Sequence, residues 1–303
     1  MEGRNGSPVV RVRRYSMPEA DDPPLVSVLV PSLDGLNNGR LAALDRDLRR
    51  QRFRNFEVVQ VVGDTRQGRA INRAARLSRG AYLLTLDDDT VLPHPDTFGR
   101  VVSVLERDPT VGIAGASTMP PPGCSAFQRI ALRQIPRAYF PVLRKTVDSD
   151  MAQHGCMAVR RKIFEAVGGE DEELVRGLDP LLRYKVRQLG YRVVIAAGAW
   201  ISHPLPDNLG ALIRRFFRNG RGSAFAQLRH PERVIELSDG FRRNRFTPRR
   251  PLWYRAARYL LRLYVACLEL QVVRIAVSAA YLAGYIYETA ASKARRFLPA
   301  RTL

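Results

Sequence analysis

The chain has 303 residues, and its 49 Lys and Arg against 29 Asp and Glu give a formal net charge of +20. An apolar fraction of 46% is ordinary for a globular protein and excludes intrinsic disorder. The three cysteines lie far apart without a CxxC pair, which excludes a disulfide framework and a zinc finger and agrees with a reducing compartment.

Residues 1–24 contain several arginines but no apolar segment of the kind found in signal peptides, so we expect a flexible basic tail there. From residue 25 onward, apolar β-branched runs alternate with segments of helical periodicity. This alternation is typical of a doubly wound α/β sheet, in which ligands bind beyond the carboxyl ends of the strands. The expected strands are 25–30, 56–62, 81–86 and 111–116, and the expected helices are 41–51, 68–77 and 98–105.

A change of composition divides the chain after residue 117. We assign residues 25–117 to a first half of the fold and residues 118–207 to a second half. The second half opens with a stretch rich in proline, arginine and aromatic residues, over 118–147, which we expect to be irregular. It continues with helices expected at 160–167 and 180–188 and a strand expected at 191–196.

The last part of the chain, residues 208–303, is basic and helical. Residues 208–262 contain fourteen Arg and three acids, although only four of all 49 cations are Lys, so an Arg-rich composition also explains part of this charge. The longest uncharged stretch, Ile275–Tyr287, has thirteen residues, whereas a membrane-spanning helix needs roughly 20. We interpret 252–291 as an amphipathic helical hairpin at an anionic membrane surface, with a packed subdomain, a dimer surface or a true span as alternatives.

Three consecutive carboxylates, Asp87, Asp88 and Asp89, follow the third expected strand. Such neighbours repel one another, and a divalent cation relieves the repulsion. Oxygen ligands of this kind suit Mg²⁺ or Mn²⁺, which share their coordination with substrate phosphates. Because residues i and i+2 of a strand point the same way, we expect Asp87 and Asp89 to face one site and Asp88 another. The alternative is a polar turn that ends the strand.

Asp64 ends the second strand in the same way, where a carboxylate can accept hydrogen bonds from a nucleobase or ribose, or can serve only in a turn. The helix that follows opens with Gly68 and Arg69 and continues to Asn72. Glycine permits close approach, and a helix N-terminus favours phosphate. The segment is neither a P-loop nor GxGxxG, which disfavours a Rossmann dehydrogenase.

The ordered set of motifs resembles family 2 glycosyltransferases over about Val26 to His203. PSLDG, FEVVQVVGD and GRAINRAARLSRGAYLLTLDDDT resemble the half of that family that binds the nucleotide sugar. HGCMAVRR, FEAVGGEDEEL and GLDPLLRYKVRQLGYRVV resemble the half that binds the acceptor. Two positions depart from the family pattern: Asp34 stands where Asn or Glu is usual, and Leu178 replaces the Glu of a Glu-Asp pair.

The resemblance implies a GT-A type mixed α/β sheet with a C-terminal helical, amphipathic extension. It also implies metal-dependent, inverting transfer from a nucleotide diphosphate sugar, with Asp179 as the general base, although Asp179 also fits a helix N-cap. The metal, Mg²⁺ or Mn²⁺, is expected on Asp87, Asp89 and His203. The residues expected to contact the donor are Pro31, Asp34, Asp64, Gly68, Arg69, Asn72, Asp87 and Asp88.

The expected acceptor is a lipid-linked or cell-surface glycan, reached from the cytoplasmic face of a membrane, and a homo-oligomer is left open. Residues 214–222 (RRFFRNGRG) are expected either as an Arg loop that closes over the diphosphate or as the basic face of a helix. Three alternative functions remain: a sugar-phosphate nucleotidyltransferase, a catalytically inactive scaffold, and a nucleic-acid binder, a class that we disfavour. The nucleic-acid binder would use the aromatic residues Phe216, Phe217, Phe241 and Phe246 among the arginines.

Overall fold

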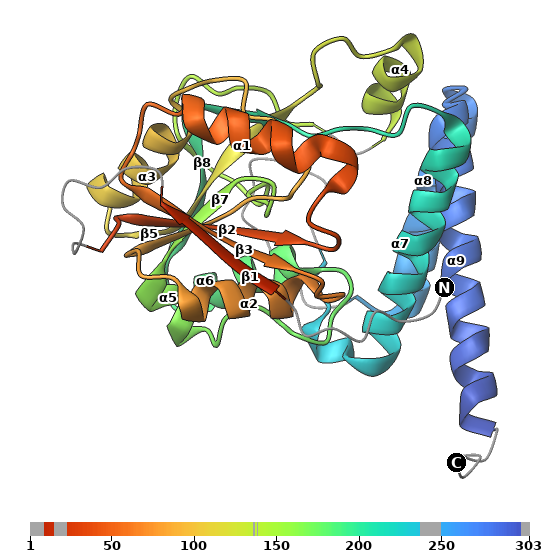
Figure 1. Ribbon diagram of the computed structural model, residues 1–303. Coiled ribbons are helices and arrows are strands. Elements are labelled where there is room, and N and C mark those ends of the chain that lie inside the picture. Colours follow the sequence, from red (N-terminus) through yellow and green to blue (C-terminus); the bar gives the residue numbers. More distant parts are fainter. Residues whose placement is uncertain (1–8, 15–22, 136, 138, 237–249, 298–303) are drawn as a thin grey trace.

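The computed structural model of the chain describes residues 9–14, 23–135, 137, 139–236 and 250–297. They form an α/β body with long helices packed along one side (Figure 1). Within this described part, eight strands form one sheet in the order β1-β3-β2-β4-β7-β5-β8-β6. The strands are β1 (Val9–Arg14), β2 (Val26–Ser32), β3 (Phe56–Val62), β4 (Tyr82–Thr85), β5 (Val111–Met119), β6 (Val147–Asp148), β7 (Met157–Arg160) and β8 (Arg192–Ser202).

The sheet is mixed, and its directions bring several strand ends to one edge. β2 runs parallel to both β3 and β4, and β5 runs parallel to β8. β4 and β5 both pair antiparallel with β7. Strands β2, β3, β4, β5 and β8 therefore all point the same way, opposite to β7. The carboxyl ends of β2, β3, β4, β5 and β8 therefore share an edge with the start of β7.

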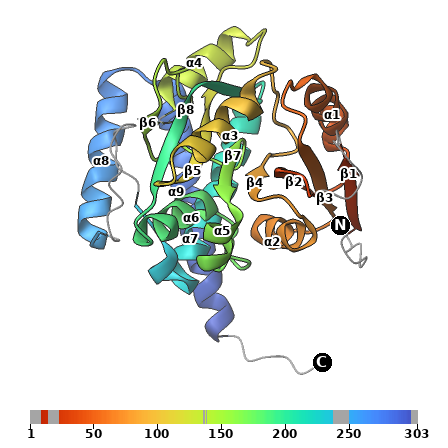
Figure 2. The same cartoon turned by 90° about the vertical axis from the view of Figure 1, so that its left-hand side faces the viewer.

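Helices cover both faces of the sheet, as Figure 2 shows. Val28 and Val30 face a core with α1 and α3, while the intervening Leu29 faces a second core with α2, α5 and α6. This alternation follows from the two-residue period of a strand. The expected α/β fold with a mixed sheet is confirmed. The helices are α1 (Arg40–Arg50), α2 (Gln67–Leu77), α3 (Thr97–Arg107), α5 (Arg161–Ala166) and α6 (Leu178–Gln188).

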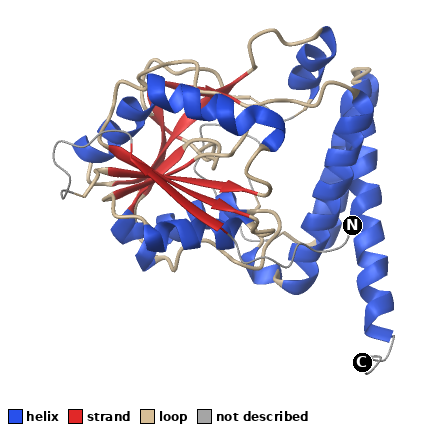
Figure 3. Ribbon diagram, in the orientation of Figure 1, coloured by secondary structure: helices blue, strands red, loops and turns tan. Residues whose placement is uncertain are grey.

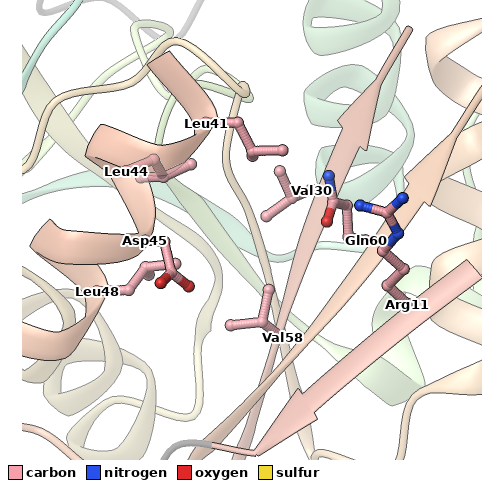
Figure 4. A pocket seen from close by; sticks show the side chains of 8 residues that line it. All are labelled: Arg11, Val30, Leu41, Leu44, Asp45, Leu48, Val58 and Gln60. Carbon is pink, nitrogen blue, oxygen red and sulfur yellow. The ribbon is translucent and has the colours of Figure 1, made fainter. Parts of the chain in front are cut away.

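The packing between α1 and the sheet leaves only a small cavity. Figure 4 shows Leu41, Leu44 and Leu48 of α1 opposite Val30 and Val58 of the strands. The cavity measures about 20 Å³, and one water needs roughly 10–15 Å³. This space is thus a packing defect rather than a ligand site.

The structure differs from the sequence prediction in strand β7, where no strand was expected, and at two further places. Residues 9–14, expected in a flexible tail, form strand β1 and pair antiparallel with β3, with Val10 opposite Val61. The stretch 118–147, expected to be irregular, contains helix α4 (Ala126–Gln134), whose capping box joins Ser125 and Gln128. The predicted divisions after residues 117 and 207 stay predictions.

The C-terminal extension is helical, as expected (Figure 3). Among the described residues, no helix combines the length and apolar character that crossing a membrane requires. The elements are α7 (Leu209–Arg229), α8 (Leu252–Leu268) and α9 (Val272–Phe297), together with the short 3-10 turns η1 (Asn37–Gly39) in the α/β body and η2 (Pro231–Arg233) after α7.

Helices α7 and α9 cross at backbone contact distance. A Cβ atom on Gly220 would collide with the carbonyl oxygen of Tyr281, and one on Gly284 would collide with the carbonyl oxygen of Phe217. Glycine at both positions is what allows the two backbones to approach so closely. The crossing therefore depends on two residues, one on each helix, that have no side chain.

Candidate functional site

A cavity of about 510 Å³ lies at the sheet edge where the parallel strands end. It collects seven of the predicted site residues, whereas Gly68, Arg69, Asn72 and Asp179 do not line it. The carboxyl ends of β2, β3, β4 and β8 all contribute, as expected for an α/β sheet. The lining residues are Pro31, Ser32, Leu33, Asp34, Asn37, Asp64, Thr65, Gln67, Asp87, Asp88, Asp89 and His203.

Asp87, Asp89 and His203 form a compact group on this cavity. One ligand atom from each lies within 4.8 Å of the others. His203 Nε2 lies 3.0 Å from Asp89 Oδ1 and 3.6 Å from Asp87 Oδ2. Burial alone would lower the pKa of His203, but its contacts with the two carboxylates raise that pKa to about 10. Two carboxylates and an imidazole beside an open cavity fit a divalent cation, whose charge would replace that of the proton on His203.

Asp88 turns away from this group, as expected, although the three carboxylates lie in the turn after β4 rather than in the strand itself. Its Oδ2 accepts a hydrogen bond of 2.6 Å from Ser32 Oγ, and its Oδ1 accepts one of 2.6 Å from Asn37 Nδ2. Burial raises the pKa of Asp88, and these two hydrogen bonds offset only part of the rise. Asp88 therefore holds the loop after β2, and Ser32 and Asn37 were not anticipated from the sequence.

Asp64 lies at the bottom of the cavity and is held by Arg69. The Arg69 guanidinium donates to both carboxylate oxygens, at 2.7 Å and 2.8 Å, and the Asp64 side chain is only 1% exposed. Burial would raise the pKa of Asp64, but the hydrogen bonds from Arg69 and from the Arg66 backbone keep it below its usual value. The expected contact of Asp64 with a nucleobase stays a prediction.

Gly68 and Asn72 contact the segment that precedes α6 instead of lining the cavity. A Cβ atom on Gly68 would collide with the carbonyl oxygen of Asp171. The Asn72 amide donates to the Glu170 carbonyl at 2.9 Å and accepts from the Glu170 N–H at 2.8 Å. These contacts give both residues a structural role, whereas the expected donor contacts stay predictions.

Asp179, the predicted base, lies at the start of α6 beside His154. The backbone N–H of His154 donates to Asp179 Oδ1 at 2.7 Å. The neighbouring residue Gly155 lies against Asp87 and His203. His154 and Gly155 therefore connect the metal-ligand group to the predicted base, and the Asp179 carboxyl, about one-third exposed, remains accessible.

The His154 ring is buried between a hydroxyl and two carboxylates. Thr85 donates its hydroxyl hydrogen to the Met157 carbonyl, so it accepts from His154 Nδ1 at 3.1 Å. Nε2 lies 3.1 Å from Glu170 Oε1 and 3.8 Å from Asp179 Oδ1. Burial alone would lower the pKa of His154, but Asp179 and Glu170 raise it to about 9. These two carboxylates favour the protonated form of the ring, and nothing in the spacing of the sequence indicated this environment.

Leu178, at the position where the family usually has Glu, lies in apolar surroundings. Leu178 is buried in a cluster with Leu174, Leu181 and Ala226. The second carboxylate near Asp179 is thus Glu170, from the preceding loop. The sequence segment GGEDEEL contained this residue, but only the fold brings it to His154.

Helix α7 passes beside the site and corrects the idea of an Arg loop. Residues 214–222 are continuous helix, and Gly222 lies against Arg176 just before α6. The Arg66 guanidinium, from the loop after β3, lies 5.7 Å from the ring of Phe225 on α7. Burial alone would raise the pKa of Asp89. Its contact with His203 lowers that pKa, and the positive charges of Arg40 and Arg215 lower it further.

Phe216 and Phe217 of α7, which are partly buried, make packing contacts with neighbouring helices. Phe216 packs against the cluster that contains Ala131 and Leu212, and the Phe217 ring lies 5.9 Å from that of Tyr287 on α9. The other two residues of the nucleic-acid hypothesis, Phe241 and Phe246, lie outside the described residues.

Comparison with known proteins decides the family. A family model described as glycosyltransferase-like family 2 matches residues 41–222, more than half of the chain. The chain belongs to this family. The family resemblance drawn from the motifs is thereby confirmed, and the mixed α/β sheet with its C-terminal helical extension is the architecture that the resemblance led us to expect.

The family 2 chain also resembles parts of two longer curated proteins. It is 27% identical over 223 residues to uncharacterized protein y4gI of Sinorhizobium fredii (strain NBRC 101917 / NGR234). That match covers 59% of this chain and 24% of that protein. It is 28% identical over 147 residues to O-antigen biosynthesis protein RfbC of Myxococcus xanthus, and this match covers 44% of this chain and 12% of that protein. This chain thus spans at most about a quarter of the length of these relatives.

Two solved structures resemble this family 2 chain more distantly. Mannosyltransferase PcManGT from Pyrobaculum calidifontis, in complex with GDP-Man and Mn²⁺, gives a TM-score of 0.49 at 18% identity and covers 94% of this chain and 82% of that one. TarS of S. aureus gives a TM-score of 0.44 at 14% identity and covers 67% of this chain and 40% of that one.

Proposed function

We propose that this family 2 chain is a metal-dependent, inverting glycosyltransferase that moves a sugar from a nucleotide diphosphate donor to a hydroxyl of a glycan. The observation that carries the proposal is the group Asp87, Asp89 and His203 on the cavity at the carboxyl edge of the sheet. The cavity beside these ligands measures about 510 Å³, and the Arg40 guanidinium lies 3.9 Å from Asp89, where it could contact a bound anion.

The proposed acceptor is a lipid-linked or cell-surface glycan. One matched relative is named an O-antigen biosynthesis protein, which supports a glycan of this kind. We place the acceptor beside Asp179, because α6 belongs to the half of the fold that the motifs associate with acceptor binding.

In the proposed reaction, Asp179 takes the proton of the acceptor hydroxyl. The hydroxyl oxygen forms a bond to the anomeric carbon while the bond from that carbon to the diphosphate oxygen breaks, and attack from the opposite face inverts the carbon. A divalent cation on Asp87, Asp89 and His203 would supply positive charge for the departing nucleotide diphosphate. The His154 N–H orients Asp179 by holding one of its oxygens.

The first test measures nucleotide diphosphate release from a panel of UDP-, GDP- and dTDP-linked sugars with Mn²⁺ or Mg²⁺. We expect turnover with at least one donor and its loss on addition of EDTA. Asp89→Asn should weaken Mn²⁺ binding, measured by calorimetry, by at least about tenfold. The matched control is Asp45→Asn on α1, which pairs with Arg49 at the surface and should leave both quantities unchanged.

Two results would contradict the proposal. Turnover that persists in EDTA would exclude the metal dependence. Absence of release with every donor, while Mn²⁺ and nucleotide diphosphate still bind, would favour the inactive scaffold instead.

A further inference from the structure

Helix α8 exposes an apolar face along its whole length. The spacing of the exposed residues places them on one side of the helix, because residues three, four or seven apart share a face. No charged residue interrupts this face. Its large members are Trp253, Leu260, Leu261, Tyr264 and Leu268, which are 72%, 63%, 62%, 61% and 65% exposed.

The opposite side of α8 is already used for packing. Ala266 is fully buried, and the Tyr259 hydroxyl donates to the Ser278 carbonyl on α9 at 2.7 Å. Leu270 and Val272, at the turn into α9, extend the exposed surface. An apolar strip of this extent on the surface of a folded chain marks an interaction site rather than a solvated helix.

The charge around the strip indicates the partner. Residues 250–274 contain five Arg and a single acid, Glu269. Arg258 and Arg262 lie on the sides of α8 away from the strip, as does Arg255, which pairs with Glu236 at 3.1 Å. Basic residues opposite an apolar face are typical of a helix that lies in the interface of an anionic bilayer. A second copy of this chain would bring a further charge of +20 and the same arginines against this surface, which disfavours self-association there.

We propose that this face of α8 docks on an anionic lipid bilayer, with the rings of Trp253 and Tyr264 at the level of the headgroups and the leucines below them. Its biological role rests on the proposed function, since docking would bring the enzyme to a lipid-linked acceptor. In Figure 2, α8 lies at one extreme of the molecule, β1 and α1 lie at the other, and α6 lies between them.

The test measures co-sedimentation of the full chain, without donor or metal, with vesicles of phosphatidylcholine alone or mixed with phosphatidylglycerol. We expect binding to the mixed vesicles that weakens in about 1 M salt, where charges are screened within about 3 Å. Replacing Leu260, Leu261 and Leu268 together by Gln should weaken binding by at least about tenfold. The matched control replaces three leucine and isoleucine residues that are about half exposed on other elements, namely Leu77, Ile130 and Leu189, by Gln.

A second measurement, of tryptophan fluorescence, leaves the exposed residues of α8 unmutated. The chain has two tryptophans, Trp200 and Trp253, so in Trp200→Phe the emission reports Trp253 alone. We expect a blue shift on addition of the mixed vesicles and none with phosphatidylcholine alone.

Three results would overturn the proposal. These are equal binding by the triple α8 variant and the wild type, absence of a Trp253 blue shift, and a dimer in sedimentation velocity that the triple variant converts to a monomer. Nucleotide diphosphate release with a water-soluble acceptor should be the same in the triple variant and the wild type. Failure of sugar transfer is therefore separable from failure of docking.

Discussion

The buried ring of His154 makes the stability of the protein depend on pH in a defined direction. Burial opposes its charge, but Asp179 and Glu170 raise the pKa of His154 from 6.5 to about 9. Since the pKa in the folded state lies above that in the unfolded state, the stabilisation is complete below pH 6.5 and is lost as the pH rises through about 9. At about 1.4 kcal/mol per pH unit, the contribution amounts to about 3 kcal/mol.

We expect His154→Gln to lower the free energy of unfolding by about 3 kcal/mol below pH 6.5 and by much less above pH 9. Urea denaturation of wild type and variant over this range, in EDTA, gives the difference directly. Glu170→Gln keeps the imidazole but removes one of its carboxylates, so it should flatten the same pH dependence. A loss of equal size at every pH would refute the reasoning, because it would indicate lost packing rather than a lost charge pair.

Four further outcomes are expected. Asp179→Asn should lower turnover by about 10²–10⁴-fold and leave the donor Kd unchanged in calorimetry; a weakened donor Kd would speak against a base. Mn²⁺ affinity should fall about tenfold per pH unit below about pH 10, because His203 must lose its proton, and a flat calorimetric profile would contradict this. Asn72→Ala should cost about 1–3 kcal/mol in urea denaturation without affecting donor binding, whereas weaker donor binding would restore its predicted nucleotide contact. Gly220→Val should lower the melting temperature markedly through collision with the Tyr281 carbonyl, and an unchanged value would exclude the close crossing.

The first half of the fold was predictable because its signals are local. Each parallel strand is a short β-branched run buried on both faces, and each ends in a polar loop. The opposite orientations of Asp87 and Asp88 were expected from strand alternation, but both residues lie past the end of β4, at a turn that the Thr90 N–H closes on the Asp87 carbonyl. His203 was placed with them through family resemblance, and the direction of β8 is what brings it to the same edge.

The remaining features depend on contacts between distant segments. Strand β1 is a basic segment that becomes a strand only by pairing with β3, so its own residues favoured a solvated tail. The contact between His154 and Glu170 needs the loop before α6 to fold back on β7. Helix α4 is different, since its capping residues Ser125 and Gln128 were readable from the sequence but were outweighed by the surrounding prolines.

The glycine crossing of α7 and α9 has a mechanical consequence. Because backbone rests on backbone at Gly220 and Gly284, neither helix can shift without carrying the other. The same α7 contacts the segment before α6 through Gly222 and Ala226. We therefore expect that holding the C-terminal helices in place also limits the motion of the segment that leads into α6 and Asp179.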